Sequence, residues 1–153
     1  MSSRKKTLVA AIFATLFALA ALYLTTSGNA KLLAPDDAQT VASGKRTYEA
    51  QCASCHGADL RGEENWKQPK PDGRMPAPPH DETGHTWHHS EQQLFAITKF
   101  GLAEAAGLKD YETDMPAYKD VLTDAEIVAV LSYIKAQWPA AIRASHDEMS
   151  APR

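Results

Sequence analysis

The stretch Cys52-Ala53-Ser54-Cys55-His56 constrains this chain more than any other feature of the sequence. Two thiols three positions apart share one helical turn, where each can form a thioether bond to a vinyl group of a porphyrin, and the next residue points its imidazole at the iron. C-x-x-C-H is therefore the attachment pattern of a covalent c-type haem. We expect one such haem, bound by Cys52 and Cys55, with His56 as an axial ligand of the iron.

Two other interpretations of a cysteine pair are less consistent with the sequence. A thioredoxin-like redox pair requires a βαβ surround, but the sequence shows no strand pattern. A structural zinc site usually has a second pair of Cys or His ligands, whereas this chain contains only two cysteines. The histidine directly after Cys55 favours haem attachment over both.

The first 30 residues differ in character from the rest. Three basic residues (Arg4, Lys5 and Lys6) precede an uncharged run over residues 8–24. That run is near the lower limit for a membrane-spanning helix and slightly long for a cleaved signal peptide. We predict a signal-anchor over residues 1–30, with a cleaved signal peptide as the alternative; either one exports the remainder of the chain.

The exported part is acidic. Three of the 16 Lys and Arg residues lie in the leader, so 13 remain against 19 acidic residues, which gives a formal charge of −6. This charge argues against nucleic acid as a partner and favours a positively charged protein surface.

The remainder predicts an all-α domain over residues 38–139, between a tether at 31–37 and a flexible tail at 140–153. Asp36 or Asp37 can cap a first helix, and Ser90 and Thr123 each begin a capping-box pattern. The clearest apolar stripe, ended by Pro139, consists of Ile127, Val130, Leu131, Ile134 and Trp138. Residues 57–89 have the glycine and proline content of a loop, and a loop this long is expected to wrap around something, here the haem.

The opposite face of the iron needs a second ligand or remains open. Met115 and Met75 each precede a proline, which restricts the backbone. We favour Met115, which comes just before a capped helix, over Met75 in the proline-rich loop and over a histidine. A thioether ligand favours reduced iron, and a filled sixth position predicts electron transfer rather than catalysis on a small-molecule substrate.

His80, His85, His88 and His89 form a second cluster. Histidines three or four positions apart can share a copper or zinc ion. The alternative is that one of them covers a haem propionate while the others are solvated.

From residue 38 to 139 the chain resembles the class I cytochromes c of bacteria, in their small single-haem form. The matching residues are Gly44 and Tyr48 before Cys52–Gly57, then Met115-Pro116-Ala117-Tyr118, and a last helix with Leu131, Tyr133 and Ile134. The resemblance implies that the first and last helices cross, with Gly44 against Tyr133 or its neighbours. It also implies that a proline carbonyl, from Pro78 or Pro79, accepts the N–H of the His56 ring. Residues 83–89 are not part of the general pattern of that family.

These features together predict a mono-haem electron carrier, not an enzyme, on the periplasmic side of a bacterial inner membrane. Its expected partners are larger redox proteins, such as an oxidase, a reductase or a dehydrogenase. Two alternatives remain: a haem-containing subunit or sensor of a larger complex, and a metal-handling protein that uses the histidines from His80 to His89.

Overall fold

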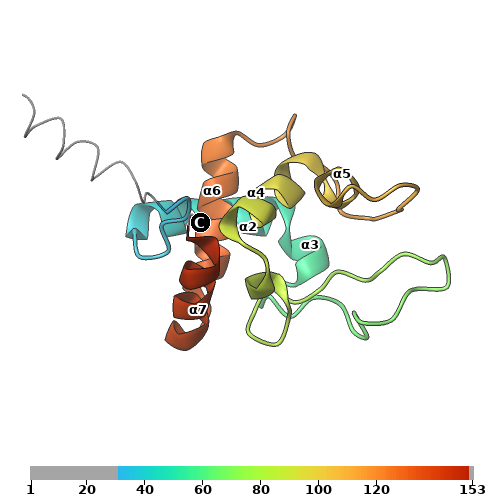
Figure 1. Ribbon diagram of the computed structural model, residues 1–153, viewed down its shortest axis with the longest axis horizontal. Coiled ribbons are helices and arrows are strands. Elements are labelled where there is room, and N and C mark those ends of the chain that lie inside the picture. Colours follow the sequence, from blue (N-terminus) through green and yellow to red (C-terminus); the bar gives the residue numbers. More distant parts are fainter. Residues whose placement is uncertain (1–30, 152–153) are drawn as a thin grey trace, which may run out of the picture. The chain divides into compact units, whose positions relative to one another are not determined.

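The structure, a computed structural model, describes residues 31–151 (Figure 1). Within this range the chain is helical and contains no strand, as the sequence predicted. The elements are α2 (Ala38–Gln51), α3 (Ala53–His56), η1 (Thr86–His88), α4 (Glu91–Phe100), α5 (Leu102–Ala106), α6 (Asp124–Ala136) and α7 (Ala140–Ser150). The predicted signal-anchor at 1–30 lies outside the described residues. Among the helices of residues 31–151, none has the length and apolar character needed to span a bilayer.

The helices begin where the capping residues predicted. The Asp37 side chain accepts a hydrogen bond from the Thr40 N–H at the start of α2, and Ser90 accepts one from Gln93 at the start of α4. Thr123 and Glu126 form both bonds of a capping box before α6. These side chains satisfy amide donors that have no partner inside the helix, so they fix where each helix starts.

Helices α2 and α6 cross at Gly44. A Cβ atom added to Gly44 would overlap the backbone of Ala129 and lie 2.9 Å from Cβ of Tyr133. The Tyr133 ring packs against that of Tyr48, with centroids 5.4 Å apart. The predicted contact between Gly44 and Tyr133 is confirmed, and it explains a glycine inside a helix, where it costs about 1 kcal/mol relative to alanine.

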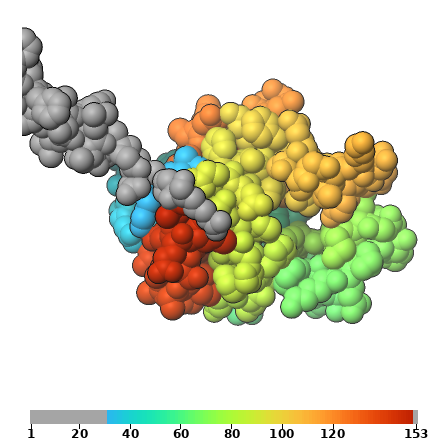
Figure 2. Space-filling view, viewed as in Figure 1, coloured from blue at the N-terminus to red at the C-terminus, as the bar shows by residue number. Residues whose placement is uncertain are grey.

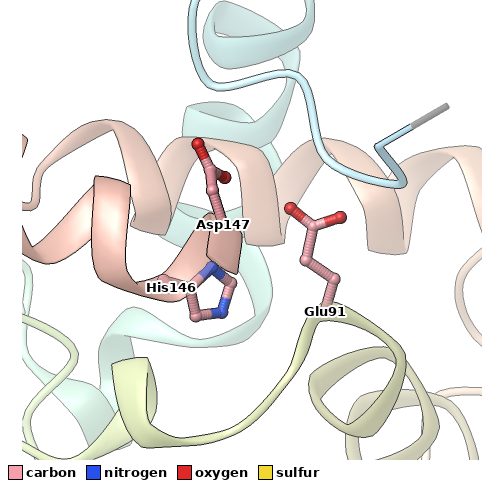
Figure 3. A group of neighbouring side chains, drawn as sticks. All are labelled: Glu91, His146 and Asp147. Atoms are coloured by element: carbon pink, nitrogen blue, oxygen red, sulfur yellow. The ribbon is translucent and has the colours of Figure 1, made fainter. Parts of the chain in front are cut away.

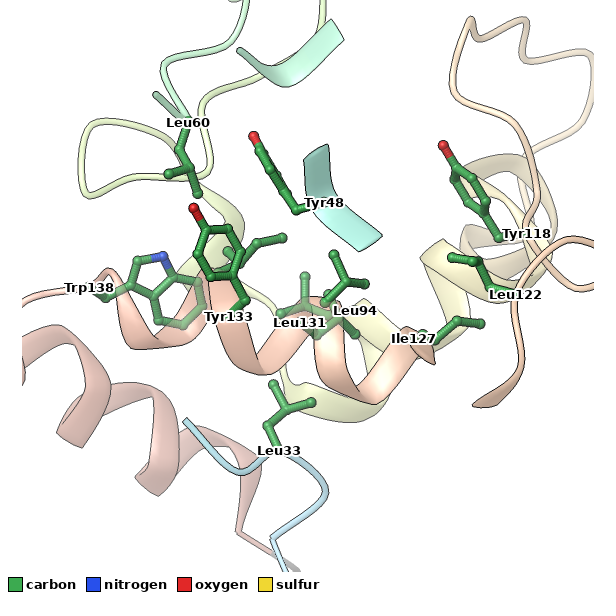
Figure 4. Close-up of a cluster of buried hydrophobic side chains, with 12 residues drawn as sticks. Leu33, Tyr48, Leu60, Leu94, Tyr118, Leu122, Ile127, Leu131, Tyr133 and Trp138 are labelled. Atoms are coloured by element: carbon green, nitrogen blue, oxygen red, sulfur yellow. The ribbon is translucent and has the colours of Figure 1, made fainter. Parts of the chain in front are cut away.

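The hydrophobic core lies around α6 and receives side chains from α2, α4 and the loops (Figure 4). Tyr48 and Ile127 have no exposed area, and Trp138 is also buried. The full cluster is Leu33, Tyr48, Leu60, Leu94, Tyr118, Leu122, Ile127, Val130, Leu131, Tyr133, Ile134 and Trp138. Through Leu60, Tyr118 and Leu122, the core therefore joins the loop after α3 and the loop before α6 to the two crossed helices.

Residues 140–150 form α7, which differs from the flexible tail predicted for 140–153. His146 of α7 is buried, its Nε2 lies 2.9 Å from the carbonyl oxygen of His89, and its ring meets Trp138 edge to face. Lys135 in α6 is fully buried and forms ion pairs with Asp147 of α7 and Glu91 of α4. Because α7 neutralises part of a buried charge, it is held against the domain.

The segment 31–37, predicted as a tether, also lies on the folded domain. Leu33 belongs to the core, and the N–H groups of Leu32 and Leu33 donate to the Glu91 carboxylate at 2.8 and 3.1 Å. The N–H of Ala34 donates to Ser132 in α6. The folded domain thus begins at or before residue 32, since its backbone donors are satisfied by α4 and α6.

Candidate haem site

The two cysteines lie at the junction of α2 and α3. Cys52 follows the last residue of α2, and its carbonyl oxygen accepts hydrogen bonds from the N–H groups of Cys55 and His56, which closes one turn. Both thiols are free; Cys52 is half-buried and Cys55 exposed. Burial raises the pKa of the Cys52 thiol to about 11, and the neighbouring Cys55 adds to this. A single turn therefore presents two free thiols and the side chain of His56.

His56 is buried, and its ring is oriented by a backbone carbonyl. Its Nδ1 lies 2.8 Å from the carbonyl oxygen of Pro78. A carbonyl only accepts, so Nδ1 carries the proton and Nε2 keeps the lone pair that a metal requires. Burial lowers the pKa of His56, which favours the neutral imidazole. Of the two prolines proposed for this contact, Pro78 makes it; the carbonyl of Pro79 accepts from Thr86 instead.

Tyr48 connects the turn to the core. Its hydroxyl donates to the carbonyl oxygens of Gly57 at 2.8 Å and His56 at 3.3 Å. Gly57 has a φ of +78°, which lets the chain turn away directly after His56. The buried phenol thus fixes the backbone that carries the imidazole.

A contact that sequence analysis missed is the stack of His80 on His56. The two rings lie 3.9 Å apart between centroids at an interplanar angle of 19°. Burial lowers the pKa of His80 well below its usual value, and the proximity of His56 adds to this. We call residues 77–80 the proximal strap, because they contact His56 through both Pro78 and His80. The available sequence signal for this contact was the position of His80 directly after Pro78 and Pro79, since two prolines restrict the backbone that carries its ring.

The two candidate methionines have different surroundings. Met115 is partly buried and packs against the core cluster, as do Cys52 and Ala53 from the C-x-x-C-H turn. Met75 is 38% exposed. Three and four residues beyond Met115, the chain is fixed to the end of α4, because the N–H of Tyr118 donates to the carbonyl oxygen of Thr98 and that of Lys119 to the carbonyl oxygen of Lys99. The surroundings favour Met115 over Met75 as a ligand.

The residue before Met115 takes part in an ion-pair network that joins the loop around residues 70–74 to the loop that contains Met115. We call residues 108–117 the distal loop. Asp114, next to Met115, accepts from Arg74 at 2.8 Å and Lys70 at 3.3 Å, and Arg74 also contacts Glu112. The two loops lie side by side on one face of the domain, green and orange in Figure 2. Exposed ion pairs therefore connect the loop after the C-x-x-C-H turn to the segment before Met115.

The four clustered histidines do not converge on one point. His80 stacks on His56 and His88 on Trp87, whereas His85 stacks on Trp66 and meets the ring of His89 edge to face. Over residues 31–151, the group of three ligand atoms close enough for one ion is instead Glu91, His146 and Asp147 (Figure 3). The Lys135 ammonium contacts both of these carboxylates. Lys135, together with Lys31 on Asp147, already balances the two carboxylates, so this group carries no argument for a metal.

The donor set fits a covalent haem. Two thiols on one turn can form two thioethers, and an imidazole with a protonated, carbonyl-bound Nδ1 has the geometry of an iron ligand. The thioether of Met115 packs against the same hydrophobic core cluster as Cys52. The indole Nε1 of Trp87 is buried and has no hydrogen-bond partner within the described part of the chain. It is a donor available to a polar group of a bound cofactor.

Comparison with known proteins agrees with this donor set. The sequence model of the cytochrome c family matches residues 41–138, which include the C-x-x-C-H turn, the proximal strap, Met115 and all of α6. Neither the curated proteins nor the solved structures compared with the chain gave a match. The match covers well over half of the sequence, and the chain belongs to the cytochrome c family.

Proposed function

We propose that this protein is a mono-haem cytochrome c of the bacterial class I type, which carries single electrons between larger redox proteins. The observation that supports it most is the buried His56 imidazole, hydrogen-bonded to Pro78 and directly following two free thiols on one turn. Membership of the cytochrome c family points to a haem-containing electron carrier. The class and the single haem are our inference from the one C-x-x-C-H pattern.

Each residue has a defined task in this proposal. Cys52 and Cys55 attach the porphyrin covalently, His56 binds the iron through Nε2, and Met115 binds it on the opposite side. The bound haem supplies a one-electron couple between ferric and ferrous iron. Pro78 keeps the His56 ring in the ligating tautomer. If His56 and Met115 hold the iron from both sides, the coordination would stay the same in both oxidation states, and no position would be left for a substrate.

The spectrum of the purified protein tests this assignment, with the two methionines as a matched pair. A weak far-red absorption band of the oxidised protein reports sulfur bound to ferric haem. We expect Met115→Ala to abolish this band and to lower the reduction potential, because the thioether stabilises ferrous iron. Met75→Ala removes the same side chain from an exposed position, also before a proline, and should leave both unchanged.

Two results would reject the proposal. Haem that acidified organic solvent strips from the polypeptide is not attached through thioethers. A wild-type protein without the far-red band, and with a spectrum that Met115→Ala does not alter, has an open iron position suited to catalysis on oxygen or peroxide.

We further propose that residues 1–30 are a signal-anchor that holds the domain on the periplasmic side of the inner membrane through residues 8–24. The basic residues before an uncharged run support this orientation. A tether raises the effective concentration of membrane-bound partners such as an oxidase, a reductase or a dehydrogenase. Membrane fractionation and the mass of the mature N-terminus test the anchor against a cleaved signal peptide.

The alternative functions predict different results. A haem-containing subunit or sensor would co-purify with a stable partner. A metal-handling protein would contain about one copper or zinc ion per chain besides iron, and the double substitution His88→Ala, His89→Ala would remove it.

A further inference from the structure

The His56 ring is restrained by two different contacts from the proximal strap. The Pro78 carbonyl oxygen fixes the position of Nδ1 at 2.8 Å. The His80 ring lies against the face of the same imidazole, 3.9 Å away and nearly parallel. A hydrogen bond restrains one atom, whereas a stacked ring restrains the tilt of the whole plane. His80 therefore adds a restraint that the carbonyl alone does not supply.

The His80 ring is itself fixed. Its Nδ1 lies 2.8 Å from Oγ1 of the buried Thr86, and the same hydroxyl donates to the carbonyl oxygen of Pro79. A hydroxyl has one proton to donate, so in this arrangement the Nδ1–H of His80 is the donor to Thr86. Rotation of the His80 ring would break that bond. The restraint on His56 is thus anchored in η1, an element separate from the strap.

The backbone of the strap is restrained by hydrogen bonds and by close packing. The N–H of His80 donates to Leu60 at 2.7 Å, and its carbonyl accepts from Nε1 of Trp138 at 2.8 Å. A Cβ added to Gly62 would lie 2.6 Å from the carbonyl carbon of Pro78, and one added to Gly84 would lie 2.7 Å from that of Pro79. Two glycines therefore allow neighbouring backbone to press directly on the strap.

We propose that His80 is a positioning residue that sets the plane of the His56 imidazole and, through it, the reduction potential of the haem iron. This inference rests on the proposed ligation of haem by His56. The overlap of imidazole π orbitals with the iron d orbitals depends on the ring plane. The hydrogen bond from Nδ1 makes the ligand more basic and favours ferric iron. Without His80, the ring tilts, its bond to Pro78 weakens, and the potential rises.

The test compares three single substitutions in the haem-loaded, full-length protein. His80→Leu removes the ring, His80→Phe keeps a ring for stacking, and His85→Leu removes a histidine of the same loop that stacks on Trp66 instead. The readouts are the reduction potential and the proton NMR shifts of the haem methyl groups in the ferric protein, whose pattern follows the plane of the axial imidazole. If His80→Leu fails to acquire haem, His80→Gln replaces it, since it also lacks the ring.

For His80→Leu we expect an altered haem-methyl pattern and a rise of up to about tenfold in the ratio of ferrous to ferric protein at a fixed solution potential, or about 59 mV for one electron. His80→Phe keeps the stacked ring but not the bond to Thr86, so its pattern should lie closer to wild type than that of His80→Leu. His85→Leu should leave both readouts unchanged. A wild-type pattern and potential in His80→Leu would overturn the inference, and so would equal shifts in His80→Leu and His85→Leu. Either of these two results would leave the proposed function intact, as long as the far-red band persists in the variants. Failure of the proposed function would instead show as a wild-type protein that lacks the band.

Discussion

The proximal strap and the distal loop carry or contact the two proposed ligands of the iron, but they are held by different interactions. Around His56 the contacts are uncharged: a proline carbonyl, a stacked imidazole, and backbone pressed together at Gly62 and Gly84. The distal loop is joined to α4 by backbone hydrogen bonds just after its C-terminal end, but the part before Met115 is held to the neighbouring loop by charges, because Asp114 is paired with Lys70 and Arg74. All three of these side chains are between 31% and 43% exposed.

This difference predicts which ligand is labile. Buried hydrogen bonds and close packing do not depend on ionic strength, whereas exposed ion pairs are screened by salt and contribute little individually. The His56 side is therefore organised by the polypeptide itself. The Met115 side depends on solution conditions, and we expect exogenous ligands to enter the iron's coordination sphere there.

The largest expected effect tests whether burial, rather than charge, decides how strongly a contact holds. Lys135 is fully buried and paired with Glu91, itself 2% exposed. We expect Lys135→Met to lower the free energy of unfolding by about 3–5 kcal/mol, since it leaves a buried carboxylate without a counter-charge. Urea titration of the haem-loaded protein measures this.

Lys70→Met is the matched control for Lys135. It removes the same charge and introduces the same side chain, but Lys70 is 31% exposed and its carboxylate partners reach solvent. We expect a much smaller change in the urea midpoint. Equal losses in the two variants would contradict the distinction between buried and exposed contacts.

A second pair of substitutions tests the packing on the proximal strap. Gly62 and Gly73 both have positive φ, +66° and +86°, so alanine is strained at either position. At Gly62 the new Cβ would also collide with the backbone of Pro78 and Pro79, whereas at Gly73 nothing lies within 4 Å. We expect Gly62→Ala to destabilise by about 3 kcal/mol and Gly73→Ala by about 1 kcal/mol. Similar urea midpoints for the two variants would show that the backbone of the strap can shift to admit the new Cβ without loss of stability.

Local sequence patterns were sufficient for the parts of this fold that depend on neighbouring residues. The predicted caps, at Asp36 or Asp37, at Ser90 and at Thr123, lie at the starts of three helices, with Asp37 as the first of them, because capping is decided within four positions of the chain. The resemblance to a known family predicted the contact between Gly44 and Tyr133, which lie 89 positions apart. No local pattern contains that information.

The features that were missed depend on long-range contacts. The segment 140–150 has few apolar residues. What holds α7 is the packing of Ile142 on the core, the buried His146 and the pairing of Asp147 with a lysine buried in α6. Residues 31–37 appeared as a tether because a single core side chain, Leu33, and backbone donors to Glu91 hold them, and neither produces a periodic side-chain pattern. The stack of His80 on His56 joins positions 24 apart through an irregular loop. Only the folded backbone brings these groups together.

The smallest expected effect tests the distal loop directly. Arg74→Gln removes the contacts to Asp114 and Glu112, whereas Arg61→Gln, in the same long loop, removes only a local contact to Asp59 that joins no second loop. We expect Arg74→Gln to speed the binding of added imidazole to the ferric protein about twofold to fivefold at low salt. In about 1 M NaCl, where the screening length is about 3 Å, the wild-type rate should rise to that of the variant. Arg61→Gln should behave as wild type under both conditions. If salt leaves the wild-type rate unchanged, or if Arg61→Gln accelerates binding equally, ion pairs do not hold Met115 in place, and the two sides of the site do not differ in the way their contacts suggest.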